Sequence, residues 1–380
     1  MTVEAVIGAN YGDEGKGLVT EFLCLSKDRA AVALANGGCQ RGHTVTDRRF
    51  GRHVFHHFGS GTFRNAPTCF CRDYLLNPMQ FVREYGELES AGVKPVSYRD
   101  AGCGFQLPVD IYLNRLLEKS RGNGKHGSVG CGIWESVKRI RSGGWLTFSE
   151  FAKFGFGVKM DYVRKSQRLA LDARLAEIGL KADSDADLFL SDGMVRHFVQ
   201  DCEFMSAACR QVDSAFCIPD IDRIVFEQGQ GLALDQLYGK DDADHTTPSY
   251  TGLIGIAEYL KETGYSGEVT ANYVTRSYAT RHGPGPFPEE NSSISFPDET
   301  NIPNEWQGTM RFGDFCGVNT AKRINRDLDE FRVRFGSDAE PRMFITHINE
   351  IPRPKGRYLR AVSTLYESAS VYADEIKRIV

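Results

Sequence analysis

The fold of this chain is decided by a glycine-rich stretch near its start, Ile7-Gly8-Ala9-Asn10-Tyr11-Gly12-Asp13-Glu14-Gly15-Lys16-Gly17. It joins an apolar run that predicts a strand, Val3–Ile7, to a segment that predicts a helix, Lys16–Leu25. Glycines in such a turn let backbone N–H groups approach a phosphate, and the N-terminus of the helix adds partial positive charge. Since Lys16 adds a full charge, the turn is predicted to hold phosphate.

The turn differs from the common phosphate-binding loop of nucleotide hydrolases. Its spacing is different, and Gly17 stands where Ser or Thr would ligate magnesium. A carboxylate such as Asp13 is costly beside phosphate unless it holds Mg²⁺ or takes a proton. An ordinary glycine-rich turn, a P-loop-like GTPase or kinase, and an inactive nucleotide-binding protein stay as alternatives to an enzyme that uses Asp13.

The rest of the chain alternates short apolar runs with amphipathic segments. This pattern predicts an α/β fold in which helices cover both faces of a central, mostly parallel sheet, with long active-site loops. The other predicted strands are Ala30–Ala35, Ile224–Phe226, Glu268–Tyr273 and Met343–Ile345. The other predicted helices are Val109–Lys119, Ser149–Phe154, Tyr162–Ile178, Leu188–Ala208, Tyr250–Lys261 and Val318–Phe335. Residues 281–303 predict a long surface loop, and residues 1–380 are expected to form a single catalytic domain.

The composition of the chain argues against several classes of protein. The 380 residues carry a net charge of −4, which gives no broad attraction to nucleic acid or membranes. The ten cysteines form no C-x-x-C pair, so neither a zinc site nor a disulfide framework is predicted. The start of the chain has no secretory signal pattern, and no apolar run approaches the ~20 residues of a membrane helix. We expect a cytoplasmic enzyme with reduced thiols, acting on small molecules.

A second glycine-rich loop follows the apolar run Ala30–Ala35, and it reads Asn36-Gly37-Gly38-Cys39-Gln40-Arg41-Gly42-His43-Thr44. In this setting His43 is predicted to act as an acid or hydrogen-bond donor at an oxyanion. A lone histidine is more often structural, so the prediction depends on the neighbouring motifs.

Together the motifs resemble those of the adenylosuccinate synthetase family. The two loops are followed, in the same order as in that family, by His56-His57-Phe58-Gly59-Ser60-Gly61, Phe226-Glu227-Gln228-Gly229-Gln230-Gly231, Thr246-Thr247-Pro248-Ser249-Tyr250-Thr251-Gly252 and Thr280-Arg281-His282-Gly283-Pro284-Gly285-Pro286-Phe287-Pro288. The resemblance implies a ligase that phosphorylates O6 of a 6-oxopurine nucleotide and then lets the amino group of L-aspartate displace the phosphate. It also implies that Asp13 is the base and a Mg²⁺ ligand, that His43 donates to the transferred phosphoryl group, and that the Gly42 carbonyl is a second Mg²⁺ ligand.

The resemblance also assigns the two nucleotide sites. For the phosphoryl donor it implies Gly12, Glu14, Gly15, Lys16, Gly17 and Thr44. For the acceptor nucleotide it implies Gln40, Ser128, Val129, Gln230 and Thr246. Cys131 replaces an arginine that the family has in the turn around Ser128. In the family an arginine also reaches the phosphate in the neighbouring subunit, which implies a homodimer with Arg139, or else Arg141, in that role.

Two further sites depart from the family pattern. The aspartate loop has Thr309 and one arginine, Arg311, which is expected to clamp a carboxylate where several arginines are usual. The donor-base motif reads Thr346-His347-Ile348-Asn349, followed by a final turn at Ser363. Because Asn349 cannot accept two guanine donors as a carboxylate does, we expect ATP or dATP as the donor rather than GTP.

The stretch between those last two motifs is short, leaving only Glu350–Ala361. This shortening, with the altered donor motif, is most similar to the phage 2-aminoadenylosuccinate synthetases, which attach aspartate to dGMP on the route to 2-aminoadenine DNA. The favoured reaction is therefore dGMP with ATP or dATP and aspartate, giving 2-amino-2′-deoxy-N6-succinyladenylate. GMP is not distinguished from dGMP by the sequence. IMP with GTP or ATP, giving adenylosuccinate, remains the alternative, because many members of that branch lose the carboxylate at the position of Asp13, which this chain keeps.

Overall fold

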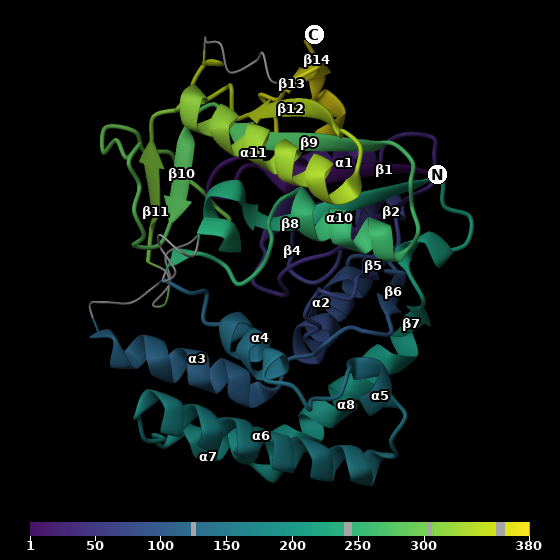
Figure 1. The fold of residues 1–380 in the computed structure, drawn as a ribbon, viewed down its shortest axis with the longest axis vertical. Helices are drawn as coiled ribbons and strands as arrows, with labels where there is room; N and C mark the ends of the chain where they lie inside the picture. The colour runs from purple at the N-terminus through teal and green to yellow at the C-terminus, as the bar shows by residue number, and fades with distance from the viewer. Residues whose placement is uncertain (123–126, 239–244, 302–305, 307, 355–361, 380) are drawn as a thin grey trace.

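A central sheet organises the molecule, seen in a computed structural model that describes residues 1–122, 127–238, 245–301, 306, 308–354 and 362–379. Within these residues ten strands pair in the order β14-β13-β12-β9-β1-β8-β2-β5-β6-β7 (Figure 1). Their bounds are β1 Thr2–Gly8, β2 Ala30–Leu34, β5 Thr68–Phe70, β6 Ser97–Asp100, β7 Cys209–Val212, β8 Arg223–Gly231, β9 Val269–Arg276, β12 Glu340–Thr346, β13 Thr364–Glu367 and β14 Lys377–Arg378. All pairs are parallel except β13 with β14, which confirms the predicted fold class.

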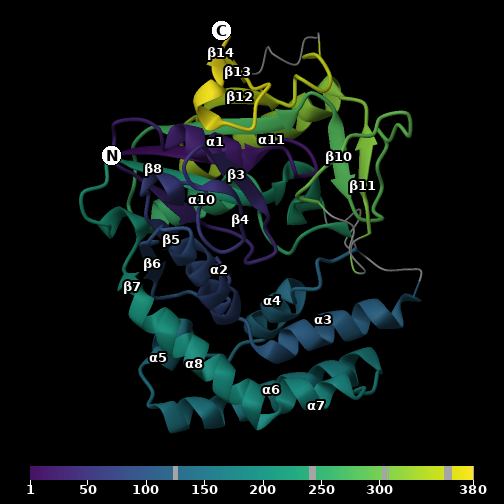
Figure 2. The same ribbon diagram turned by 180° about the vertical axis from the view of Figure 1, so that it is seen from behind.

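The central strands β1, β8 and β9 are buried along most of their length because helices cover both faces of the sheet. Alternate residues of β1 point to opposite sides, so Val6 joins one buried cluster and Ala5 and Ile7 join another. On the first face the sheet packs against α1, Lys16–Leu23, and on the second against α10, Leu253–Glu262, and α11, Gly317–Phe335. Figures 1 and 2 show these two layers from opposite sides.

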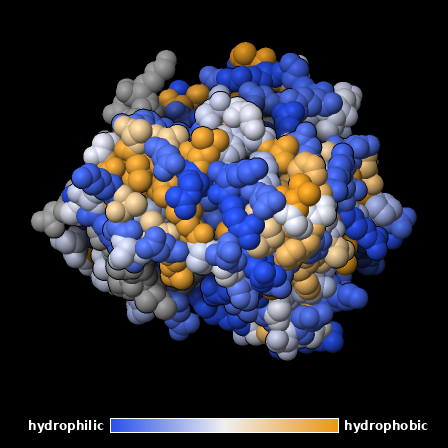
Figure 3. All heavy atoms as spheres, turned by 90° about the horizontal axis from the view of Figure 1, so that it is seen from below, coloured by the Kyte–Doolittle hydropathy of each residue, from blue (hydrophilic) through white to orange (hydrophobic). Residues whose placement is uncertain are grey.

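A group of helices extends from one end of the sheet (Figures 1 and 2). Its members are α2 Pro78–Ser90, α3 Pro108–Ser120, α4 Ile133–Arg141, α5 Phe148–Ala152, α6 Phe156–Ile178, α7 Asp185–Leu190 and α8 Asp192–Ala208. Seen from below, this end of the molecule carries hydrophobic side chains scattered among hydrophilic ones (Figure 3). None of the helices in the described ranges is both long enough and apolar enough to cross a bilayer.

All the predicted strands and helices occur, with shifts at their ends. The helix predicted over Leu188–Ala208 is instead two helices, because the Ser191 hydroxyl accepts a hydrogen bond from the Met194 N–H at 3.2 Å and caps α8. Helix α2 and the hairpin β3 His43–Asp47 with β4 Gly51–Phe55 were not expected. The predicted loop over residues 281–303 begins inside the hairpin β10 Ala279–His282 with β11 Met310–Gly313, and its residues 302–303 lie outside the described part.

Candidate active site

The glycine-rich turn after β1 is held by the side chain of Glu14. Its carboxylate is 2% exposed and accepts hydrogen bonds from the N–H groups of Asn10, at 2.7 Å, and Gly12, at 3.3 Å. Burial raises the pKa of Glu14 to about 8. Gly15 then begins α1 with a left-handed φ of +95°, which a side chain rarely adopts. The predicted donor role of Glu14 therefore falls to its backbone, because its carboxylate supports the turn.

Asp13 is placed differently, in the same turn. It has a left-handed φ of +57° and is half-buried, and within the described part of the chain its carboxylate accepts no hydrogen bond. Its backbone carbonyl accepts a hydrogen bond from Arg276 Nε at 2.6 Å. The residue is thus fixed through its backbone, while its side chain is available to a substrate or a cation.

The second loop lies against the first. A side chain at Gly17 would meet the backbone of Thr44 at 2.8 Å and of His43 at 3.1 Å, so the start of α1 packs directly on β3. Lys16, 3% exposed, interacts electrostatically with Asp13 on its own turn and with Glu227 in the middle of β8. Burial lowers the pKa of Lys16, as expected for an ammonium group that is short of water. The structure therefore brings the two glycine-rich loops together.

His43 has a carboxylate partner that the sequence interpretation did not assign. His43 Nδ1 lies 2.8 Å from Glu227 Oε1, and both side chains are buried. Although burial opposes its ionisation, His43, Arg41 and Ser60 lower the pKa of Glu227 to about 2, so it stays a carboxylate. Burial lowers the pKa of His43 by more than Glu227 raises it. An imidazole held in this way gives up a proton readily.

Arg41 completes this buried group. Its guanidinium donates to the backbone oxygens of Glu227, at 3.2 Å, and Asn36, at 3.1 Å, and lies 5.2 Å from the centre of the Tyr74 ring. Asn36 in turn donates to the carbonyls of Gly229, at 3.2 Å, and Tyr250, at 3.0 Å. The second loop is thereby fixed to β8 and to the segment before α10.

Three predicted acceptor residues border these loops. Gln40 lies over Gly37, and its side-chain oxygen is buried without a hydrogen-bond partner. Gln230 is the second-to-last residue of β8 and has a φ of +67°, and its backbone approaches Gly12. Thr246 lies in the segment before α10, where the next residue bonds back to the Leu234 carbonyl at 2.8 Å. The structure therefore gathers Gln40 and Gln230 at the carboxyl ends of the parallel strands, where such sheets bind ligands.

The predicted phosphate turn lies between α3 and α4 and is fixed by Asn114. The Asn114 amide donates to Ser128 Oγ at 3.0 Å and accepts from the Gly132 N–H at 3.1 Å. Gly132 caps α4 with a φ of +78°, and no side chain caps the first N–H groups of that helix. Val129 stands within the turn, half-buried. Free N–H groups at a helix N-terminus suit an anion, as predicted for this turn.

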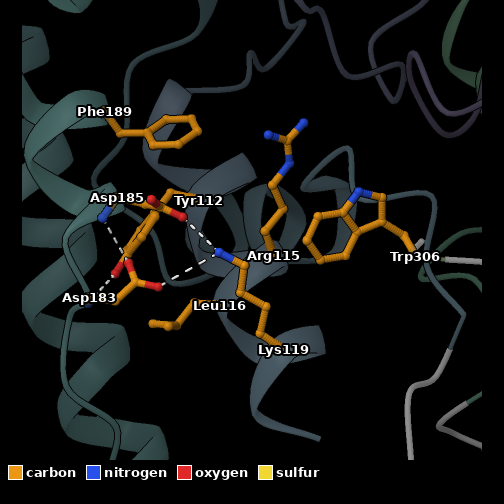
Figure 4. Close-up of a pocket in the computed structure, with 8 residues that line it drawn as sticks. All are labelled: Tyr112, Arg115, Leu116, Lys119, Asp183, Asp185, Phe189 and Trp306. Atoms are coloured by element: carbon orange, nitrogen blue, oxygen red, sulfur yellow. Dashed lines mark hydrogen bonds and ion pairs between the residues drawn. The ribbon is translucent and has the colours of Figure 1, made fainter. Parts of the chain in front are cut away.

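A pocket of about 250 Å³ opens behind the turn, between α3 and residues 183–189 (Figure 4). Arg115 lies on its edge, where its Nε donates to the Gly130 carbonyl at 3.4 Å and its guanidinium lies 5.8 Å from the Trp306 ring centre. Lys119 on the same helix bonds Asp185 at 2.7 Å. Of the two cations in the pocket, Arg115 is therefore the one beside the turn.

The structure corrects the prediction for Arg139. This side chain is 9% exposed and binds Asp110, with Nη2 at 2.8 Å from Oδ2, while it also donates to the Phe105 carbonyl at 2.7 Å. It is therefore buried inside its own chain and does not extend toward a partner. Arg141 is exposed and donates to the Pro248 carbonyl at 3.1 Å, beside the segment that holds Thr246. The two arginines, which are two positions apart on one helix, looked equivalent in sequence, because only the fold shows which one meets Asp110.

This assignment predicts a clear difference between the two arginines. Arg139→Ala is expected to lower the free energy of unfolding by about 3–5 kcal/mol, because it leaves the Asp110 carboxylate buried without its partner. Arg141→Ala, the exposed control, is expected to change it by less than about 0.5 kcal/mol. Urea unfolding followed by circular dichroism measures both. Equal values for the two variants would contradict the structural role of Arg139.

The predicted aspartate residues lie on the β10–β11 hairpin. Thr309 is exposed just before β11. Arg311 donates to the Gly283 carbonyl at 2.7 Å and binds the Glu290 carboxylate with Nη1 at 2.7 Å from Oε2. The guanidinium therefore holds the loop at residues 283–290 against β11.

The donor-base motif adjoins the opening turn. Thr346 Oγ1 donates to the Glu14 carbonyl at 2.9 Å, and Asn349 follows on the surface beyond the end of β12. Ser363, predicted to share this site, lies just before β13 and beside the start of β12, at the opposite end of β12 from Asn349. There its hydroxyl donates to the Pro341 carbonyl at 2.8 Å. The structure therefore corrects the prediction that Ser363 belongs to the donor-base site. The turn beside Asn349 is instead Ser368–Ser370, which follows β13 and whose Ser368 carbonyl accepts from the Ile348 N–H at 3.2 Å.

Comparison with known proteins decides the family. The sequence model of the adenylosuccinate synthetase family matches residues 5–323 of this chain. The chain belongs to the adenylosuccinate synthetase family. The adenylosuccinate synthetase of Alcanivorax borkumensis is 32% identical over 298 residues, which cover 75% of this chain and 64% of that protein. The chain thus matches less than two thirds of the length of this relative. The adenylosuccinate synthetase of Psychrobacter sp. is 27% identical over 377 residues, covering 88% of this chain and 80% of that protein.

Two solved structures share the adenylosuccinate synthetase fold. Fully ligated adenylosuccinate synthetase from Plasmodium falciparum superposes with a TM-score of 0.67 at 14% identity, covering 100% of this chain and 87% of that one. The succinoaminodeoxyadenylate synthetase of cyanophage S-2L, bound to dGMP and dATP as an energy donor, has a TM-score of 0.64 at 15% identity, covering 99% and 95%. At 14% and 15% identity, these two similarities show a shared fold alone.

Sequence reasoning missed three features of this candidate site. Glu227 was quoted within a motif but given no role, although a carboxylate inside an apolar strand signals a paired, functional group. Arg276, which fixes the Asp13 backbone, gave no local signal, because 263 residues separate them. The Ser368–Ser370 turn was not assigned, because the Ser-Thr step at Ser363 looked more like the family motif and was assigned in its place.

Proposed function

We propose that residues 1–380 act as one catalytic domain that joins L-aspartate to C6 of a 6-oxopurine nucleotide through a 6-phosphoryl intermediate, driven by a nucleoside triphosphate. One observation carries this proposal: the two glycine-rich loops pack together, so that Lys16 lies between the Asp13 turn and the buried His43–Glu227 pair. A phosphate-binding cation flanked by a free carboxylate and an imidazole has the groups that both steps of this reaction need.

In the first step a base is needed, because a lactam oxygen attacks phosphorus poorly while N1 keeps its proton. Asp13, whose carboxylate accepts no hydrogen bond within the described residues, takes that proton. His43, in its protonated form, donates a hydrogen bond from Nε2 to the phosphoryl group as negative charge spreads over its oxygens, while the Glu227 carboxylate accepts from Nδ1 and fixes the ring. In the second step the amino group of aspartate attacks C6 and phosphate leaves.

Magnesium fits the same loops. Mg²⁺ commonly binds one or two protein carboxylates and completes its shell with substrate phosphates and water. The free carboxylate of Asp13 suits this donor set, and the carbonyl of half-buried Gly42 is a second candidate ligand. When bound, the ion would neutralise charge on the transferred phosphate.

For the substrates we infer dGMP as acceptor and ATP or dATP as donor. Asn349 supports the donor assignment, since its amide suits an adenine edge better than guanine, which presents two adjacent donors. The fold shared with the cyanophage enzyme that binds dGMP and dATP supports the acceptor assignment. IMP is the second candidate, because the N1 proton that Asp13 would remove is present in both purines.

A matrix of acceptors and donors tests the function directly. IMP, dGMP and GMP are each combined with ATP, dATP and GTP in the presence of aspartate and Mg²⁺, and released phosphate and the succinylated product are measured. We expect the largest kcat/KM with dGMP and ATP or dATP. A larger value with IMP would identify an AMP-route enzyme, and no product with any pair would overturn the ligase assignment.

Exchange of the donor-base residue provides a sharper test of donor choice. Asn349→Asp is expected to move the kcat/KM ratio of GTP to ATP upward by about tenfold or more, because a hydrogen bond to a charged group contributes about 1.5–3 kcal/mol. The matched control is Ser363→Ala at the opposite end of β12 and β13, which should leave the ratio unchanged. If Ser363→Ala shifted the ratio and Asn349→Asp did not, the donor base would bind elsewhere.

We propose also that the enzyme is a homodimer. Val158 and Leu169 on α6 and Leu188 on α7 expose apolar side chains, and these two helices lie at the lower end of the molecule (Figure 1). Such exposed apolar side chains support an interface there. Light scattering after size-exclusion chromatography measures the mass in solution. A monomer at the concentrations used for the activity assay would contradict the dimer.

A further inference from the structure

Two cysteines from different active-site loops meet beside the predicted acceptor site. Cys39 belongs to the second glycine-rich loop and is 7% exposed, and Cys131 belongs to the turn before α4 and is partly exposed. Both pack in a small apolar cluster with Leu75 and Ile133, and the two side chains are close enough to interact electrostatically. These residues lie 92 positions apart in sequence, so the fold alone brings them together.

The pair is held in place by a buried amide. Gln106 is 0% exposed, its Nε2 donates to the Cys131 carbonyl at 2.7 Å, and its Oε1 accepts from Cys39 Sγ at 3.3 Å. Asn77 Nδ2 donates both to Gln106 Oε1, at 2.9 Å, and to Cys39 Sγ, at 3.3 Å. One side chain therefore connects the two cysteine loops and keeps the two residues in the same cluster.

The two thiols differ in reactivity in a way that suits sequential oxidation. The neighbouring Cys39 side chain lowers the pKa of Cys131 against the effect of burial, and the Arg115 guanidinium lowers it further. The neighbouring Cys131 side chain and burial raise the pKa of Cys39. Cys131 is thus the more acidic and more exposed thiol, the type that oxidants attack first, while Cys39 remains a protonated thiol beside it.

We propose that Cys39 and Cys131 form a reversible disulfide when the protein meets a peroxide, and that this bond closes the acceptor side of the site. The Cys131 thiolate attacks one peroxide oxygen, forming the sulfenic acid and releasing hydroxide, which a proton converts to water. The Cys39 sulfur then attacks the Cys131 sulfur, the S–O bond breaks, and a second water leaves. Two thiols lose two hydrogens in total, and one peroxide is reduced to two waters. A dithiol such as dithiothreitol reverses the bond by exchange.

The bond would act on both acceptor loops at once. Gln40 is the next residue after Cys39, and Ser128 and Val129 precede Cys131 in the same turn. A disulfide holds its sulfurs at about 2.05 Å, closer than two unbonded thiols, so it draws the loops together. A displacement of about 1 Å in a substrate-positioning group can cost about a hundredfold in rate. This effect on rate rests on the proposed function, whereas formation of the bond does not.

Mass spectrometry tests the bond itself. The full chain is reduced, freed of reductant, treated with hydrogen peroxide, blocked with an alkylating reagent and digested with trypsin without reduction. Residues 30–41 and 126–138 are tryptic peptides that each carry one cysteine, Cys39 and Cys131. We expect one species with the summed mass of both peptides less two hydrogen atoms, which dithiothreitol abolishes. If each peptide is instead recovered singly, with alkylated or over-oxidised cysteine, the proposal is overturned.

Activity of the same samples tests the consequence. Peroxide should lower kcat/KM for the acceptor about a hundredfold in the wild type, with recovery in dithiothreitol. In Cys39→Ser and Cys131→Ser the ratio of oxidised to reduced activity should stay near one, whereas Cys217→Ser, an exposed cysteine elsewhere, should respond as the wild type does. A cross-link without loss of activity would overturn closure of the site. A cross-link in a protein that turns over no nucleotide would sustain the bond and refute the proposed function.

Discussion

Replacing Asp13 with asparagine is expected to lower kcat for phosphate release by about 10²–10⁴-fold, the usual contribution of a general base. The amide can neither take the N1 proton nor offer a charged ligand to magnesium. Asparagine adopts the left-handed conformation as readily as aspartate, so the φ of +57° costs no additional strain. The side-chain change therefore tests the chemistry of this position without disturbing the turn.

The measurement is steady-state phosphate release with saturating acceptor, donor, aspartate and Mg²⁺, beside a thermal melt. The control is Asp220→Asn, because Asp220 also has a left-handed φ, of +61°, but its exposed side chain pairs with Arg29 before β8. We expect the melting temperatures of both variants to stay near that of the wild type and only Asp13→Asn to lose turnover. A wild-type kcat for Asp13→Asn would remove this residue from the role of base.

Sequence reasoning succeeded where the signal was local. The apolar run of β1, the glycine turn and the amphipathic start of α1 are read from consecutive residues, and the structure has them with ends shifted by one or two positions. Gln40, His43 and Gln230 were assigned through motifs that follow strands, and the parallel sheet brings such turns to one edge.

Sequence reasoning failed where contacts between residues distant in sequence decide where a side chain lies. Arg139 and Arg141 stand on one helix with similar local surroundings, but Asp110, which pairs with Arg139, comes from α3. Ser363 and Ser368 flank the same strand, and only the register of β13 with β12, Arg342 opposite Thr364, places Ser363 at the wrong edge. Glu227 was overlooked because its partner His43 is distant in sequence.

The second large effect is expected at Glu227. Glu227→Gln should lower the free energy of unfolding by about 3–5 kcal/mol, since it leaves His43 and Arg41 buried without their carboxylate. It should also lower kcat by about 10²–10⁴-fold, because the ring loses the group that fixes its Nδ1 proton and orientation. Glu227 contacts His43 and is expected to act as a positioning residue, so both effects come through the imidazole.

The pH dependence of the free energy of unfolding distinguishes a role of the ionised Glu227 carboxylate from a contribution of packing alone. The pKa of Glu227 is about 2 in the folded protein against 4.5 in the unfolded chain. A depressed carboxyl pKa contributes stability that is fully present above pH about 4.5 and is lost as the pH falls toward 2. The stability difference between wild type and Glu227→Gln, measured by urea unfolding, should therefore shrink as the pH is lowered from 7 to 3.

Asp327→Asn supplies the matched control for turnover. Asp327 is also buried, but it binds the Leu253 N–H at 2.8 Å and the Tyr273 hydroxyl at 2.9 Å, away from His43. It should leave kcat near the wild-type value, and only Glu227→Gln should move the pKa in the kcat–pH profile that reports His43. If the two variants lost turnover equally with unchanged profiles, Glu227 would serve stability alone, and His43 would act without a carboxylate partner.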